Sequence, residues 1–174
     1  MEKHKFCLCL LLITTALNLS AQDFNLSAVG GYLNLDINFK VNGEEFDLGN
    51  KSSGFYIGAL TNITLTEKID LQPELLFGAI EDNNSLYLGA LGKYNVSDEF
   101  SLLLGPAFNY LLEDIVDDYS KLGIFAVIGP SYDITDKFFA QAKYSFQLNN
   151  FYTGDSDITS RANFLLVGVG YKIL

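Results

Sequence analysis

The chain has 174 residues, of which 49% are hydrophobic and 14% aromatic, and its formal net charge at pH 7 is −10. This length is typical of one domain, and no linker rich in proline or serine divides the chain. The negative charge argues against nucleic acid as a partner, because phosphates would be repelled and the sequence offers no basic patch to offset that.

The N-terminus has the layout of a secretory signal peptide. Lysines precede an apolar run over residues 6–17, and small residues end at Ala21. The run is too short for a transmembrane helix, which needs about 20 residues. We therefore expect a signal peptide over 1–21, cleaved after Ala21, and a single mature domain over 22–174. Both cysteines lie in the signal, so the mature domain would have neither disulfides nor thiolate metal sites.

Three short segments share one pattern, in which an apolar residue, three turn-forming residues and a second apolar residue follow one another. They cover residues 65–69, 96–100 and 134–138, and each predicts a tight hairpin turn. On both sides of every turn the chain alternates apolar with polar or small residues, which is the period of a β-strand. Eight strands are predicted in this way, over residues 24–39, 54–65, 69–80, 85–96, 100–112, 122–134, 138–148 and 161–173.

The connections between these strands alternate in length. Tight turns lie at one end, and longer loops lie at the other, over residues 40–53, 81–84, 113–121 and 149–160. Short periplasmic turns and long outer loops are typical of transmembrane barrels. An even number of strands also allows the sheet to close. The predicted fold class is therefore all-β, an eight-stranded antiparallel up-and-down transmembrane β-barrel.

The same alternation holds across all the turns, so one face of the sheet is entirely apolar. Phe77, Phe108 and Val169 are typical of this face, and no charged residue falls on it between Phe55 and Ile173. A Lys or Arg on the lipid face at mid-depth costs about 2 to 4 kcal/mol, so this exclusion indicates a bilayer outside. Only the first strand is ambiguous, because Gly30-Gly31 permits a bulge that would reverse its faces.

Pro73 and Pro106 lie within predicted strands, although proline cannot donate a hydrogen bond to a neighbouring strand. We expect both to mark β-bulges.

Aromatic residues recur near the periplasmic ends of the strands. Amphipathic rings at this depth are typical of the interface between membrane and water. The sequence predicts an aromatic girdle formed by Tyr94, Tyr132, Tyr171, Phe100 and Phe138.

The opposite face carries the charges, which would point into the barrel. Counted from the turns, Glu74 and Lys143 lie at the same depth, with Lys93 close to it, while Asp70, Asp133 and Lys172 lie near the periplasmic rim. A buried charge without a partner costs about 3 to 5 kcal/mol, so we expect Glu74 to bridge Lys143 and Lys93. The alternative is a water-filled lumen in which each charge is solvated.

The sequence offers no catalytic site and no cofactor site. Its only histidine, His4, lies in the predicted signal, so mechanisms that depend on a histidine base are not available to the mature domain. Acidic residues in the outer loops far outnumber the basic ones. Their spacing matches no calcium-binding loop, but they could bind a basic envelope protein.

Several segments resemble the small porin-like outer-membrane β-barrel proteins of Gram-negative bacteria, PorT-type proteins among them. The residues that carry the resemblance lie in 71–77, in the hairpin 132–146, and in the closing strand 168–174. The resemblance implies location in the outer membrane, contact with its lipid, and assembly by the barrel insertion machinery. Leu174 departs from the pattern, since an aromatic residue usually ends such chains. The family has no shared catalytic residue to transfer.

Three functions remain open. The first is a non-enzymatic outer-membrane barrel that serves as a structural or surface-interaction protein or as a very narrow channel. The second, suggested by the resemblance, is a PorT-like accessory of a secretion or surface-assembly system. The third is a soluble periplasmic lipocalin-like binder, which would bury Phe77 and Phe108 and expose Glu74 and Lys143.

Overall fold

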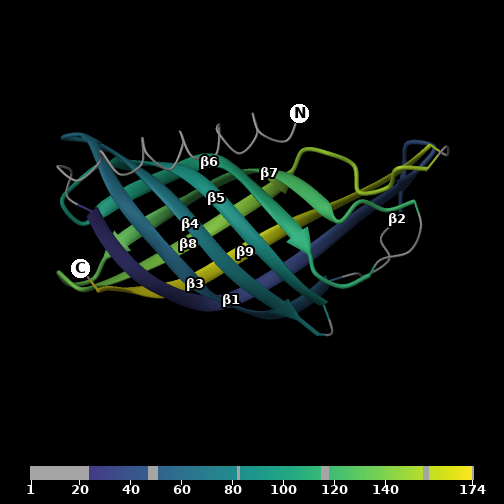
Figure 1. Ribbon diagram of the computed structural model, residues 1–174. Coiled ribbons are helices and arrows are strands. Elements are labelled where there is room, and N and C mark those ends of the chain that lie inside the picture. Colours follow the sequence, from purple (N-terminus) through teal and green to yellow (C-terminus); the bar gives the residue numbers. More distant parts are fainter. Residues whose placement is uncertain (1–23, 47–50, 82, 115–117, 155–156, 174) are drawn as a thin grey trace, which may run out of the picture.

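The structure, a computed structural model, describes residues 24–46, 51–81, 83–114, 118–154 and 157–173 (Figure 1). The predicted signal peptide and Leu174 lie outside the described residues. All regular secondary structure in the described residues is β-strand. The strands are β1 (Phe24–Val41), β2 (Glu44–Phe46), β3 (Lys51–Thr66), β4 (Ile69–Ile80), β5 (Asn83–Asn95), β6 (Phe100–Leu111), β7 (Leu122–Asp133), β8 (Phe138–Gln147) and β9 (Ile158–Lys172).

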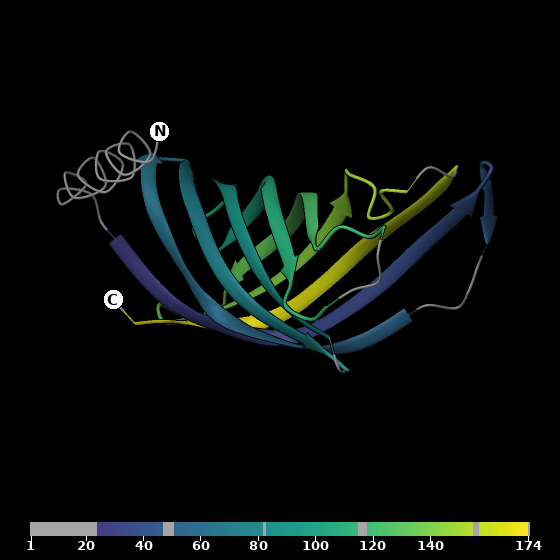
Figure 2. The same cartoon turned by 45° about the vertical axis from the view of Figure 1, so that its right-hand side comes forward.

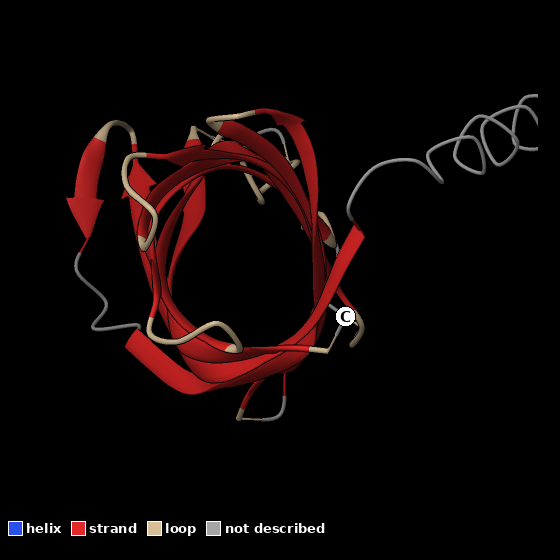
Figure 3. Cartoon of the chain, turned by 90° about the vertical axis from the view of Figure 1, so that its left-hand side faces the viewer, coloured by secondary structure: helices blue, strands red, loops and turns tan. Residues whose placement is uncertain are grey.

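The strands form one antiparallel sheet that closes on itself. The order is β2-β1-β3-β4-β5-β6-β7-β8-β9, and β1 also pairs with β9. Viewed along its axis, the sheet forms a closed ring (Figure 3). β2 and β3 pair with the same edge of β1 in succession, so the barrel wall has eight strands. The predicted fold class is confirmed.

A hydroxyl group stabilises each of the three predicted hairpin turns. Thr66, Ser97 and Thr135 each accept hydrogen bonds from the backbone amides two and three residues further on, at distances of 3.0 to 3.3 Å. Ser and Thr side chains often satisfy turn amides in this way. The repeated sequence pattern therefore produces one repeated turn geometry.

Two strands extend well beyond the rest of the barrel at the outer end, two or three residues further than the sequence predicted, and a short strand, β2, lies where it predicted loop. β1 continues to Val41 and pairs there with β9 and with β2, and Figures 1 and 2 show these strands projecting past the others. Asn42 and Gly43, with φ angles of 51° and 82°, form the turn into β2. An Asn-Gly pair favours this left-handed turn, which joins strands tightly, and the sequence prediction overlooked it.

The alternation of faces runs along the eight wall strands and is interrupted at the end of β3, where the register shifts between Thr64 and Thr66. Phe108 is 43% exposed and Val169 is 59% exposed, whereas Lys143 is fully buried inside the barrel. On β1, Val29 and Leu33 are buried while Tyr32 is exposed, so Gly30-Gly31 contains no bulge and the faces do not reverse. The apolar face therefore points outward, the reverse of what the lipocalin-like alternative requires.

Glycine at position 31 is required by a close approach between strands. A β-carbon there would lie 2.2 Å from the carbonyl oxygen of Val167 on β9. Gly31 thus lets β1 and β9 meet closely where the barrel closes.

The expectation that Pro73 and Pro106 mark bulges is wrong. The pairs Leu60↔Glu74 and Ile63↔Leu71 share one register, so β3 and β4 pass Pro73 without an inserted residue. The pairs on either side of Pro106, between β5 and β6, also keep their register. Each proline leaves only a short gap in pairing with one neighbour, because it lacks an amide hydrogen. The register shift in this region lies between Thr64 and Thr66.

Candidate functional site

An ion pair crosses the middle of the barrel. The Nζ atom of Lys143 lies 2.6 Å and 2.8 Å from the two carboxylate oxygens of Glu74, and both side chains are 0% exposed. Glu74 is on β4 and Lys143 on β8, which are the third and seventh of the eight wall strands and so face each other across the interior. The contact therefore spans the lumen instead of following its wall.

Neutral side chains surround this ion pair and cross the interior beside it. Gln72 donates a hydrogen bond to Glu74 at 3.3 Å and accepts one from Gln141 at 3.1 Å. The hydroxyl groups of Tyr87 and Ser145 lie 3.2 Å apart, and the ammonium of Lys143 is 5.9 Å from the centroid of the Tyr87 ring. The contacts between Gln72 and Gln141 and between Tyr87 and Ser145 again join β4 or β5 to β8 across the interior.

The remaining members of the predicted network are arranged differently from the expectation. In the described part of the chain, no salt bridge joins Lys93 to Glu74. Lys93 is instead the cross-strand neighbour of Asp70, while the neighbour of Glu74 on β5 is Gly89. Depth counted from the turns ignores the stagger between tilted strands, and Lys93 consequently lies closer to the periplasmic rim than Glu74 does.

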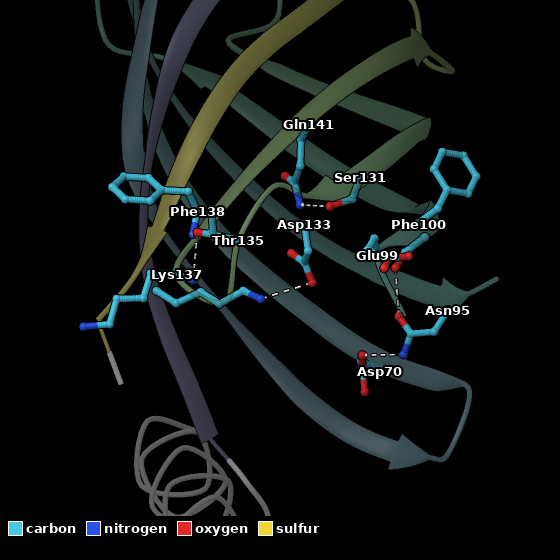
Figure 4. A network of polar contacts seen from close by, with 12 residues as sticks. Asp70, Asn95, Glu99, Phe100, Ser131, Asp133, Thr135, Lys137, Phe138 and Gln141 are labelled. Atoms are coloured by element: carbon cyan, nitrogen blue, oxygen red, sulfur yellow. Dashed lines mark hydrogen bonds and ion pairs between the residues drawn. The ribbon is translucent and has the colours of Figure 1, made fainter. Parts of the chain in front are cut away.

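At the periplasmic rim, the three predicted charges form two separate contacts. Lys172 pairs with Asp133 at 3.1 Å. Asp70 accepts a hydrogen bond from the side chain of Asn95 at 3.0 Å, and Asn95 in turn accepts one from Ser101. Figure 4 shows Asp70 and Asn95 side by side, apart from Asp133.

All five residues of the predicted girdle are exposed on the outside of the barrel near its periplasmic end. Tyr94, Tyr132, Tyr171, Phe100 and Phe138 are between 36% and 51% exposed. Phe100 is the cross-strand neighbour of Tyr132, and the rings of Phe138 and Tyr171 are 5.1 Å apart. Aromatic residues are also exposed toward the opposite end, such as the cross-strand neighbours Tyr32 and Phe55. The sequence predicted that Phe55 faces outward but no girdle at that end.

The outer mouth contains a cavity of about 460 Å³ above the ion pair's layer. Its walls are mainly apolar, and its floor includes the buried polar residues Ser85 and Asn109. The sequence prediction missed this feature. Inward-facing apolar residues near the outer strand ends, such as Ile37 and Ile80, were the available signal.

A hydrogen-bonded latch lies beside this mouth. The carboxylate of Glu113 accepts hydrogen bonds from the backbone and side-chain nitrogens of Asn84, at 2.7 Å and 2.6 Å. These bonds, the backbone one foremost, hold the pKa of the Glu113 carboxyl below its ordinary value. Next to it, a hydrogen bond from Lys121 at 2.8 Å lowers the pKa of Asp114.

Within the described ranges, no group of three or more His, Cys, Asp or Glu side chains could hold a metal ion. No helix in that same part of the chain is long and apolar enough to cross a membrane.

Solved structures with the same fold come from several proteins. The attachment invasion locus protein Ail of Yersinia pestis is 15% identical, with a TM-score of 0.51 over 86% of this chain and 98% of that one. The outer-membrane enzyme PagL is 14% identical, with a TM-score of 0.52 over 87% of this chain and 99% of that one. At this identity the likeness shows the fold alone, and one fold supports different functions.

No curated protein sequence matches the chain. A family model, in contrast, matches residues 6–172, which is nearly the whole sequence. The match agrees with the closed barrel, the apolar outer face and the aromatic residues at its ends. The chain belongs to the outer membrane protein β-barrel domain family and is an outer-membrane protein.

Proposed function

We propose that this protein is a non-catalytic outer-membrane barrel that acts through its outer surface and does not conduct solutes. The observation that carries the proposal is the ion pair between Glu74 and Lys143, fully buried and spanning the interior. A conducting pore needs a continuous water-filled path. The side chains that cross the barrel beside this pair leave little room for one, in keeping with the filled interior of an eight-stranded barrel.

The outer end supports a role in surface interaction. The extension formed by β1, β2 and β9 projects past the rest of the barrel and offers its backbone and side chains outside the bilayer. Acidic residues such as Glu44, Asp118 and Asp157 are exposed at this end. A basic region of another envelope protein is the partner that this charge would favour, because opposite charges speed encounter.

The absence of catalysis is part of the proposal. The domain over 22–174 contains neither histidine nor cysteine, so the histidine base and the cysteine nucleophile that many acyl and peptide hydrolases use are missing. Cleavage of the signal peptide after Ala21 and assembly by the barrel insertion machinery belong to the same proposal. The PorT-like role is a narrower hypothesis that no observation of this structure favours.

Conductance in planar lipid bilayers tests the proposal. We expect the purified, folded protein to give no stable conductance steps. The double variant Glu74→Ala/Lys143→Ala, which removes the ion pair that spans the lumen, should conduct. Stable steps from the unaltered protein, comparable with those of the double variant, would contradict the proposal.

A further inference from the structure

The cavity at the outer mouth is a cup with mainly apolar walls. Its volume of about 460 Å³ lies within the range of small-molecule pockets in proteins. The void below it, of about 10 Å³, has room for no more than about one water molecule, so the cavity ends there. Its rim includes the exposed residues Asp114 and Tyr119, so it is reached from the outer side of the barrel. Apolar side chains form most of its wall, among them Leu35, Ile37, Ile80, Leu111, Ala162 and Phe164.

The wall of the cup is an incompletely covered part of the barrel's core. Leu35, Ile37 and Phe151 pack against the buried apolar cluster but are themselves only partly buried. On the outside of the barrel, lipid covers apolar side chains of this kind, whereas the cup faces the aqueous side. Apolar surface in a concave site that faces water favours an apolar ligand, because binding removes the apolar surfaces of both partners from water.

The cup offers no free charge among its described lining residues. Asp114 is the only charged residue in that set, and its carboxylate accepts a hydrogen bond from Lys121 at 2.8 Å. The floor is engaged as well, since Asn109 donates to the hydroxyl of Ser85 at 3.0 Å. A charged ligand would lose hydration in the cup without gaining a free counter-charge, which costs far more than moving a neutral apolar molecule. An anion would also be repelled by the net charge of −10.

We infer that the cup binds a compact, uncharged, apolar molecule that enters from the outer side. The ligand would complete the apolar packing that Leu35, Ile37 and Phe151 lack. Its affinity would come from the burial of apolar surface and not from a directed hydrogen bond. Recognition of this kind discriminates against charge and against molecules that are too large for the cup. This binding site goes beyond the proposed surface role and does not depend on it.

Three probes that share one cage-shaped hydrocarbon body test the class of ligand. The neutral probe is 1-fluoroadamantane, the cation is 3-fluoro-1-adamantylamine, and the anion is 3-fluoroadamantane-1-carboxylate. Fluorine NMR measures their binding to the full protein in lipid nanodiscs, with empty nanodiscs as the blank for partition into lipid. We expect saturable binding of the neutral probe above the blank. The cation and the anion should bind about tenfold more weakly or worse, because each brings a charge to an apolar wall.

Two variants fill the cup from different walls, Ala162→Trp on β9 and Leu111→Trp on β6. Each variant that folds should lose saturable binding of the neutral probe. Ala142→Trp is the matched control, because Ala142 lies on the lipid-facing side of β8, and it should bind as the unaltered protein does.

Three results would overturn the inference. They are neutral-probe binding no greater than in empty nanodiscs, equal or tighter binding of either ion, and full binding by a folded cup-filling variant. The comparison of probes uses the unaltered protein, so it decides the matter even if neither variant folds. Conductance is not involved, so the proposed function is tested separately.

Discussion

The ion pair between Glu74 and Lys143 is the contact on which the interior depends most. Two opposite charges that are both fully buried stabilise each other only as a pair, and removing one leaves the other unpaired at a cost of about 3 to 5 kcal/mol. Glu74→Gln should therefore lower the temperature at which the folded, fast-migrating band disappears on an unboiled gel. Glu67→Gln, at an exposed turn residue, is the matched control and should leave that temperature unchanged.

A second substitution separates the ion pair from simple loss of packing. Combining Glu74→Gln with Lys143→Met removes the unpaired charge, so the double variant should recover much of the lost stability. If Glu74→Gln melts with the unaltered protein, the interior charges are solvated and the lumen holds water.

Position 31 leaves no room for the β-carbon that every residue other than glycine carries. Gly31→Ala would place a β-carbon 2.2 Å from the carbonyl oxygen of Val167, at the seam between β1 and β9. We expect this variant to give little or no heat-modifiable protein. At Gly92 the nearest atom would be at 3.5 Å, an ordinary contact, so Gly92→Ala should fold normally. Equal yields of folded protein from the two variants would show that the seam is looser than described.

Single residues were predictable from the sequence to different degrees. The meeting of Glu74 and Lys143 follows from strand parity and equal depth. The position of Lys93 does not, because the stagger between strands moves it toward Asp70. Asn109 and Tyr56 could be assigned to the interior, but whether their polar atoms find partners depends on the packing around them.

At the scale of elements, the latch between Glu113 and Asn84 joins the end of β6 to the start of β5. The pKa of Glu113 lies below its ordinary value because the folded state donates hydrogen bonds to the carboxylate. The latch therefore contributes fully above the unfolded pKa and is lost as pH falls through the lower, folded-state pKa.

The backbone amide resonance of Asn84 reports this titration by NMR. We expect it to shift with a midpoint below that of an ordinary exposed glutamate, and the shift should vanish in Glu113→Gln. A midpoint at the ordinary glutamate value would mean that the latch does not hold in solution.

The strands and turns were largely predictable, because alternation and turn residues are local signals. The outermost hairpin was not, because the predicted strands ended at Phe39 and began at Arg161 and left out β2, although Asn42-Gly43 is a strong hairpin signal. The prediction of bulges at Pro73 and Pro106 failed because a proline can interrupt hydrogen bonding to one neighbouring strand without changing the register, as Pro73 does.

At the scale of the whole molecule, the fold exchanges the usual positions of apolar and polar groups. The exposed surface carries large apolar side chains such as Leu104 at 64% and Ile57 at 60%, while Gln72, Glu74 and Lys143 are buried. Such a surface is stable only against an apolar solvent. The sequence predicted this arrangement because parity persists across every turn. It could not predict the cavity at the outer mouth, whose shape depends on how eight strands close.

Quenching of single tryptophans by brominated lipids tests this arrangement most directly, since the chain contains no tryptophan of its own. Phe108 is 43% exposed on β6 and Phe125 is 0% exposed on the neighbouring β7. We predict that lipids brominated along their acyl chains quench the fluorescence of Phe108→Trp strongly and that of Phe125→Trp weakly. Strong quenching at position 125 with protection at position 108 would contradict the account, because the apolar side chains would then face the axis of the barrel.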